Sequence, residues 1–255
     1  MTPAAPPPLH IILAAHGSTE HPGAAELVRA CGDAIRTTAL PGVGDIIEAF
    51  WLGGEFPLRE ALDRCPAGDA LIVPLLMNDG YFSETVFPRE LAPERPRAHL
   101  RHVEVAPPLG LHPRFEPIVQ QRMEAACLAH QARHVLLVGH GTERDARSAR
   151  RTRELAEHAQ NTPSIQAAGI RIDVAFLDQA PYLRDTLRDA PWPNDEPLVL
   201  VPWFTADGAH AALDIPELVQ RLRPAATIVE ASVGAQAFPT LCREIVEERL
   251  VRGNQ

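Results

Sequence analysis

The sequence predicts an α/β protein made of two similar tandem halves, each a small doubly wound parallel sheet, facing a central cleft. One observation is an internal repeat, in which IILAAHGSTE around His16 matches VLLVGHGTER around His140. Three further blocks recur in the same order, around Phe50 and Phe176, Pro74 and Pro202, and Val103 and Val229. We therefore expect two halves, residues 1–131 and 132–255.

The other observation is the alternation of apolar runs with helical stretches. In the second half we expect strands at 135–138, 170–176, 198–204 and 226–231. Helices are expected between and after them, at 146–159, 182–188, 215–221 and 238–252. The first half repeats this order. Continuous apolar runs are typical of strands covered on both faces, and strands alternating with helices predict parallel sheets with right-handed crossovers.

Composition excludes several classes of protein. The 255 residues are 45% hydrophobic and 22% charged, a globular balance, and the net charge of −9 argues against a general nucleic-acid binder. The apolar runs are too short to span a membrane, and residues 1–8 have no signal-peptide pattern, so we expect a cytoplasmic protein. All 24 basic residues are arginine, which excludes a Schiff-base or phosphate-loop lysine.

Three candidate catalytic residues of the second half fall just after predicted strands: His140, Asp178 and His210. If the first and third strands are neighbours, their tips lie about 5 Å apart, so the two histidines can converge beside the acid. Imidazole and carboxylate suit a first-row divalent metal, with His140 and His210 as its ligands. The alternatives are a loop-carbonyl bond for His140 and a helix N-cap for Asp178.

The first half repeats this pattern incompletely. His16 stands at the place of His140, but Phe82 stands at the place of His210, and residues 51–54 contain no acid. We therefore expect the working site in the second half. His16 is a further candidate metal ligand, facing the cleft from the opposite side.

Two features of the second half are candidates for binding an anionic substrate. The loop after the third strand offers backbone N–H groups ahead of a helix, and its residues are Thr205, Ala206, Asp207, Gly208, Ala209 and His210. Five arginines follow His140, at positions 144, 147, 150, 151 and 153. They are either a solvated helix face paired with neighbouring acids or, for one or two of them, ligands of substrate carboxylates.

The motifs AAHGST, VGHGT, FLDQAPYL and VPWFTADGAHAALDIP resemble the CbiX/SirB family of sirohydrochlorin chelatases, as two tandem units over nearly the whole chain. The resemblance implies a chelatase-like fold and insertion of Co²⁺ or Fe²⁺ into sirohydrochlorin, for cobalamin or sirohaem synthesis. It implies His140 and His210 as metal ligands, with Asp178 as the acid of the site. The partner is then a tetrapyrrole with peripheral carboxylates, and Ni²⁺ is a third candidate metal.

We expect a histidine or Asp178 to accept the pyrrole protons, with no nucleotide, because no phosphate-binding fingerprint is present. The chain can act as a monomer or as a homodimer. One alternative is a non-catalytic metal or tetrapyrrole carrier that uses the same residues. Another, a phosphotransfer histidine enzyme, is disfavoured because Gly139 stands where an RHG motif has arginine.

Overall fold

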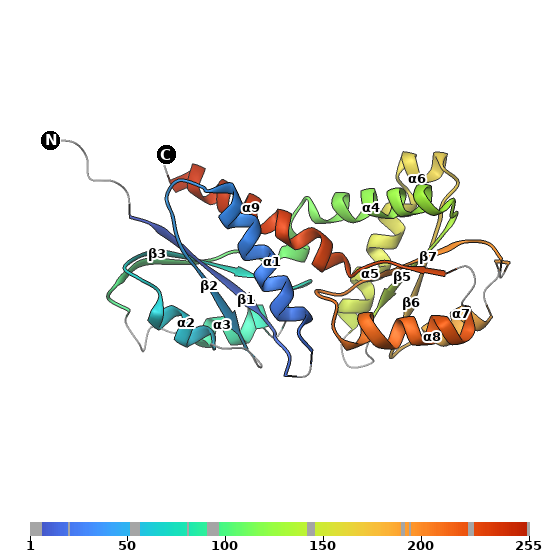
Figure 1. Ribbon diagram of the computed structural model, residues 1–255, viewed down its shortest axis with the longest axis horizontal. Helices are drawn as coiled ribbons and strands as arrows, with labels where there is room; N and C mark the ends of the chain where they lie inside the picture. The colour runs from blue at the N-terminus through green and yellow to red at the C-terminus, as the bar shows by residue number, and fades with distance from the viewer. Residues whose placement is uncertain are drawn as a thin grey trace. The chain divides into compact units, whose positions relative to one another are not determined.

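The computed structural model describes residues 7–19, 21–51, 57–80, 82–90, 97–141, 146–189, 192–193, 195–223 and 227–253 (Figure 1). The chain forms two compact units. Unit 1 comprises Met1–His112 with Ala237–Gln255, and unit 2 comprises Pro113–Gln236.

Unit 1 contains a parallel sheet in the order β2-β1-β3-β4. Its strands are β1 (Leu9–Ala15), β2 (Val43–Phe50), β3 (Gly68–Pro74) and β4 (Leu100–Val105). Its helices are α1 (Gly23–Thr38), α2 (Leu58–Arg64), α3 (Phe87–Glu90), which continues a π-turn at Phe82–Val86, and most of α9 (Val233–Gly253). A short 3-10 turn covers Leu109–Leu111.

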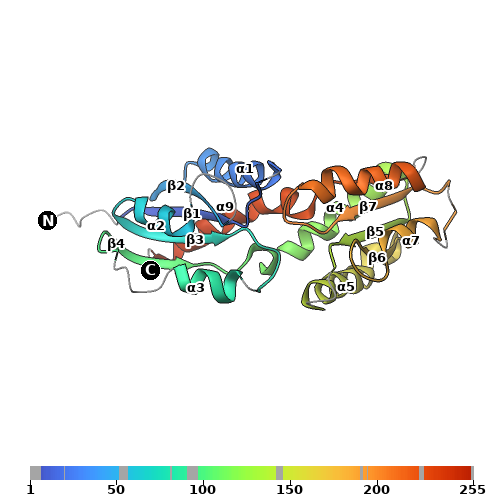
Figure 2. The ribbon, with the colours of Figure 1, turned by 90° about the horizontal axis from the view of Figure 1, so that it is seen from below.

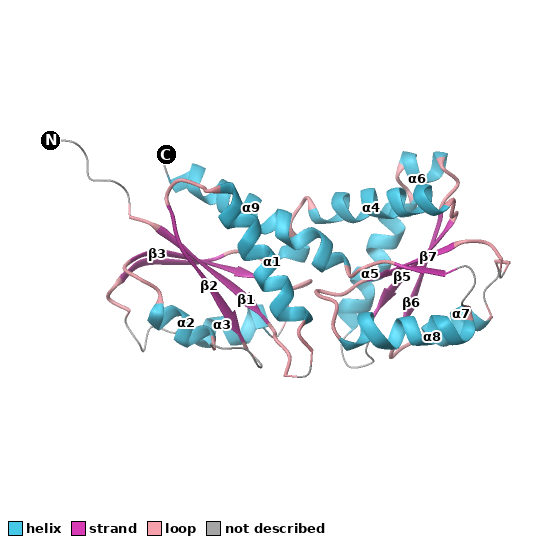
Figure 3. Cartoon of the chain, in the orientation of Figure 1, coloured by secondary structure: helices cyan, strands magenta, loops and turns pink. Residues whose placement is uncertain are grey.

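Unit 2 contains a second parallel sheet in the corresponding order, β6-β5-β7-β8. Figures 2 and 3 label three of these strands, β5, β6 and β7. Its strands are β5 (His134–Gly139), β6 (Arg171–Phe176), β7 (Leu198–Pro202) and β8 (Thr227–Val229). Its helices are α4 (Phe115–His130), α5 (Ala146–Gln160), α6 (Pro163–Ala167), α7 (Leu183–Arg188) and α8 (Ile215–Leu222), the last continuing a π-turn at His210–Asp214. The predicted fold class, two similar α/β parallel-sheet halves, is confirmed.

Apolar runs form the central strands because helices cover both faces of each sheet. All seven residues of β1 and all five of β7 are buried. In unit 2, Leu136, Val138 and Leu200 pack with Leu183 of α7 and Ile215 of α8, whereas α5 contacts β5 and β6. β7 ends at Pro202, two residues before the predicted end, and α6 was not predicted.

The compact units differ from the halves 1–131 and 132–255 by an exchange of helices. The last helix of the first half, α4, belongs to unit 2, where its Glu116 Oε1 lies 2.6 Å from Arg151 Nη2 of α5. Most of α9 belongs to unit 1, where Arg249 Nε donates to Glu104 Oε2 at 2.5 Å. Each half therefore supplies the closing helix of the other half's unit.

In the part of the chain that the structure describes, no helix has the length and apolarity that crossing a membrane requires.

Candidate functional site

The strand order of unit 2 brings the predicted site residues to one edge of the sheet. β5 pairs in parallel with both β6 and β7, which confirms that the first and third strands of this half are neighbours. His140 follows β5 directly, Asp178 follows β6, and His210 begins the π-turn after β7. The carboxyl ends of adjacent parallel strands are the usual position of a ligand site in such folds.

His140 and His210 lie against each other at this edge. Their ring centroids are 4.9 Å apart and their planes meet at 86°. About half of each side chain is exposed, at 47% and 49%. The two imidazoles are therefore open to solvent and close enough to approach one ion.

A carboxylate lies beside the Nδ1 atom of each histidine. His140 Nδ1 lies 3.3 Å from Asp178 Oδ2 and 2.9 Å from the carbonyl oxygen of Gly141. His210 Nδ1 lies 2.7 Å from Asp214 Oδ2. Carbonyls and carboxylates accept hydrogen bonds, so each Nδ1 is the donor and each Nε2 keeps its lone pair. Metal-binding histidines use this tautomer: one ring nitrogen donates to a carboxylate or carbonyl that orients the ring, and the other nitrogen binds the metal.

A glycine explains the turn that holds His140. Gly141 has φ +72°, and a Cβ atom there would lie 2.5 Å from Gln179 Cγ and 2.8 Å from Phe176 Cβ. Only glycine adopts this backbone readily and fits this space. The His140 carbonyl then accepts the N–H groups of Leu177 at 3.0 Å and Asp178 at 2.9 Å. The same turn therefore places His140 and Asp178 together.

The loop from Thr205 to His210 is tied to the segment before α9. Asp207 Oδ1 accepts the N–H of Ser232 at 2.7 Å, and Ser232 Oγ donates to the Ala206 carbonyl at 3.1 Å. The N–H of Gly208 donates to the same carbonyl at 2.9 Å, so it is already used within the loop. Asp207 thus fixes the loop that presents His210, and the role of this loop in substrate binding stays a prediction.

The arginines after His140 that the structure describes are occupied within unit 2. Arg151 pairs with Glu116, and Arg150 Nε lies 3.7 Å from Glu154 Oε1, as the solvated-face interpretation predicts. Arg153 donates to the Ala180 carbonyl at 3.2 Å and lies over the Phe176 ring. Arg144 and the Arg147 side chain lie outside the described residues.

Sequence reasoning missed Asp214, which orients His210. Two signals could have found it. It stands four residues after His210, one helical turn away. The repeat also places Val86 at its position in the first half, just as Phe82 replaces His210. The histidine and its carboxylate are therefore absent together from the first copy.

Unit 1 has the same histidine turn as unit 2, but different residues surround its histidine. His16 Nδ1 lies 3.0 Å from the Gly17 carbonyl, and Gly17 has φ +80°, as in the His140 turn. The indole of Trp51 contacts the His16 ring edge-on, with centroids 5.3 Å apart. The Phe82 side chain and residues 52–56 lie outside the described residues.

Among the described residues, no three His, Cys, Asp or Glu side chains gather into a metal-binding group. At the edge of the unit 2 sheet, the donor set is two imidazoles with a carboxylate behind each. A pair of ligands leaves coordination positions open, which suits an ion that is handed on rather than held.

The fold and this site define a class of protein: two α/β units, with a pair of neighbouring histidines at the strand ends of one unit whose Nε2 atoms are open to a metal ion. The family model CbiX matches the chain twice, over residues 10–126 and 134–249. The chain therefore belongs to the CbiX family, and the resemblance seen in the sequence is confirmed.

Relatives agree with this assignment. The chain is 27% identical over 229 residues to a probable sirohydrochlorin cobaltochelatase of Halobacterium salinarum, covering 81% of this chain and 75% of the relative. A structure of CbiX, described as the terminal enzyme of sirohaem biosynthesis in denitrifying bacteria, has a TM-score of 0.69 at 22% identity over 94% of this chain and 98% of that one. SirB from Bacillus subtilis with Fe³⁺ has a TM-score of 0.71 at 19% identity, covering 94% and 95%.

Proposed function

We propose that this protein inserts Co²⁺ or Fe²⁺ into sirohydrochlorin, and that the reaction takes place at His140 and His210 of unit 2. Family membership supports the chelatase activity. The observation that carries the site is the contact between the two imidazoles, each with its Nδ1 proton held by a carboxylate or carbonyl. Both Nε2 lone pairs are then available for the incoming ion.

The chemistry requires protons to leave as the ion enters. A divalent ion replaces two pyrrole N–H protons of the macrocycle, so an acceptor must stand close to the metal. Asp178 is 62% exposed and lies 3.3 Å from His140 Nδ1, which suits it to take a proton and pass it to solvent. As the ion leaves for the macrocycle, each freed imidazole can accept a proton at Nε2 and serve as the second base.

We propose the remaining properties from this chemistry. The reaction needs only the ion, the macrocycle and a base, so no nucleotide takes part. Imidazole pairs also accept Ni²⁺, which is a third candidate ion. The protein works in the cytoplasm, as a monomer or a homodimer, on a tetrapyrrole that carries peripheral carboxylates.

The test is absorption spectroscopy of sirohydrochlorin with Co²⁺ or Fe²⁺ and a substoichiometric amount of protein. We expect many turnovers per chain and a loss of turnover in His140→Ala and His210→Ala. A spectral shift that stops at one equivalent would instead support a carrier of metal or tetrapyrrole. Full activity in both variants would refute the site.

A further inference from the structure

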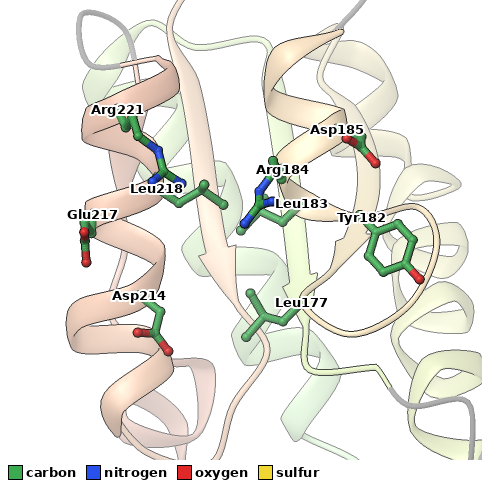
Figure 4. A pocket seen from close by; sticks show the side chains of 9 residues that line it. All are labelled: Leu177, Tyr182, Leu183, Arg184, Asp185, Asp214, Glu217, Leu218 and Arg221. Atoms are coloured by element: carbon green, nitrogen blue, oxygen red, sulfur yellow. The ribbon is translucent and has the colours of Figure 1, made fainter.

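A groove lies between α7 and α8 of unit 2 (Figure 4). Its volume is about 580 Å³, and its lining includes Leu177 at the end of β6 and Asp214 before α8. Asp214 is also the carboxylate that accepts from His210 Nδ1 at 2.7 Å. Asp214 therefore belongs both to the lining of the groove and to the surroundings of the proposed metal site.

Two arginines project into this groove from the facing helices. In Figure 4 the guanidinium of Arg184 extends from α7 and that of Arg221 extends from α8, with Leu218 between them and Leu177 lower in the view. Neither guanidinium has a hydrogen bond or an ion pair with another described residue. Arg188, also on α7, is by contrast held by Asp185 at 2.9 Å and Asp189 at 2.7 Å.

Three acids also line the groove, at positions 185, 214 and 217, and two of them have partners. Asp185 pairs with Arg188, and Asp214 holds His210. Glu217 is exposed and extends away from the groove on the outer side of α8 in Figure 4. The unpaired charges that extend into the groove are therefore the two guanidiniums, next to the apolar side chains of Leu183 and Leu218. A ligand that fits has an apolar body and a carboxylate at its edge, because guanidinium binds carboxylate in a bidentate manner.

The repeat provides an internal comparison. The corresponding cavity of unit 1, which α2 and α3 line, measures about 200 Å³ and includes Phe50, Trp51 and Phe87. Arg59 matches Arg184 in the repeat, but Glu90 stands where unit 2 has Leu218. The larger groove and its second guanidinium thus occur in the copy that has the histidine pair.

We propose that the α7–α8 groove binds a carboxylate arm of the tetrapyrrole substrate, with Arg184 and Arg221 as its ligands. The proposal rests on the proposed function, because it takes the macrocycle as the occupant. Of the arginines after His140, Arg151 and Arg153 have partners in unit 2, and carboxylate binding by one or two of the five stays a separate prediction. Asp214 lines one end of the groove and accepts from His210, so the groove adjoins the proposed metal site.

The test compares Arg184→Ala, Arg221→Ala and the double variant with wild type, in equilibrium binding of metal-free sirohydrochlorin and in steady-state kinetics. We expect each single change to raise Kd and KM for the macrocycle about tenfold, the effect of losing one charge-assisted bond. The Kd for Co²⁺ is expected to stay unchanged, which shows that the variants are folded. Arg188→Ala is the matched control on the same helix and should match wild type.

A second measurement uses sirohydrochlorin whose carboxylates are esterified. Wild type should bind the ester more weakly than the acid, and the double arginine variant should lose most of this difference. Unchanged Kd values for the acid in the double variant would overturn the groove assignment. Failure of the proposed function gives a different result, namely no metal insertion by wild type, while the binding of the macrocycle still reports on the groove.

Discussion

Unit 1 and unit 2 share a fold, a strand order and a histidine turn, yet their strand ends differ in chemistry. Both turns place Nδ1 of the histidine against the next carbonyl, at 3.0 Å for His16 and 2.9 Å for His140. Beside His16 stands the indole of Trp51, whereas beside His140 stand His210 and Asp178. The comparison teaches that the scaffold is kept in both copies while the side chains beside the shared histidine differ, which is the difference on which the proposed site in unit 2 depends.

The backbone requirements of the scaffold explain why it is kept. Gly17 and Gly141 both have positive φ. A Cβ atom on Gly110 of unit 1 would overlap the Met77 carbonyl, and one on Gly234 would overlap the Thr205 carbonyl. These four glycines are needed for folding in either copy. The positions of His210 and Asp214 carry no such backbone requirement, and the first copy has Phe82 and Val86 there.

The largest effect should come from His210→Ala. This change removes one of the two proposed metal ligands. Loss of a partner that only orients a ligand costs about 10- to 100-fold, so we expect loss of the ligand itself to lower metal insertion about 100-fold or more. Phe82→Ala, at the matching position of unit 1, is the control and should keep most of the activity. The rate of sirohydrochlorin metallation checks both. Equal losses in the two variants would contradict the assignment to unit 2.

Asp214→Ala should have the next largest effect. Without the carboxylate at 2.7 Å, the His210 ring loses its fixed tautomer and orientation, and metal affinity should fall about 10- to 100-fold. Asp214→Asn keeps a hydrogen-bond acceptor and should fall between wild type and Asp214→Ala. Titration with Co²⁺ measures the affinities. In a protein that already carries His210→Ala, the further change Asp214→Ala should not lower the Co²⁺ affinity again. A further loss of affinity would show that the carboxylate does not act through His210.

Gly141→Ala should lower stability as well as activity. A side chain at φ +72° that also meets Gln179 and Phe176 should cost about 1–3 kcal/mol in the free energy of unfolding. Chemical denaturation measures it. Gly169→Ala is the control for positive φ alone, because a Cβ atom there meets nothing within 4 Å. If the two variants lose equal stability, the contacts with Gln179 and Phe176 are not the cause.

The smallest effect concerns two buried thiols, one in each unit. Burial, with a smaller contribution from Asp45, raises the pKa of Cys65 to about 11, and burial, with a smaller contribution from Glu124, raises that of Cys127 to about 11. Between pH 9 and pH 11 both thiols stay neutral in the folded protein, whereas they ionise in the unfolded chain. Their contribution to stability is therefore complete below pH 9 and lost as the pH rises from 9 to 11.

The rate of alkylation by iodoacetamide at pH 8 tests the raised pKa values of Cys65 and Cys127. Native protein should react at these thiols more slowly than protein in denaturant by a factor of about 100, as expected for a pKa about two units higher in the native state. Rapid labelling of native Cys127 alone would show that unit 2 opens around α4.

Much of this arrangement could be predicted from the sequence. The repeat and the apolar runs predicted the parallel strands, and neighbouring strand ends predicted that His140 and His210 meet. The exchange of α4 and α9 could not be predicted, because it depends on long-range packing such as Glu116 against Arg151. The role of Asp214 was missed although its spacing of four residues from His210 was a signal, because the sequence did not predict that a helical turn begins at His210 itself.

The most direct test of the assignment to unit 2 uses the member of the histidine pair that both copies share, the histidine of the HG turn. Sirohydrochlorin metallation is measured for His16→Ala and His140→Ala at equal protein, Co²⁺ and macrocycle concentrations. We expect His140→Ala to lose nearly all turnover and His16→Ala to retain most of it. Loss of turnover in His16→Ala with normal activity in His140→Ala would contradict the assignment.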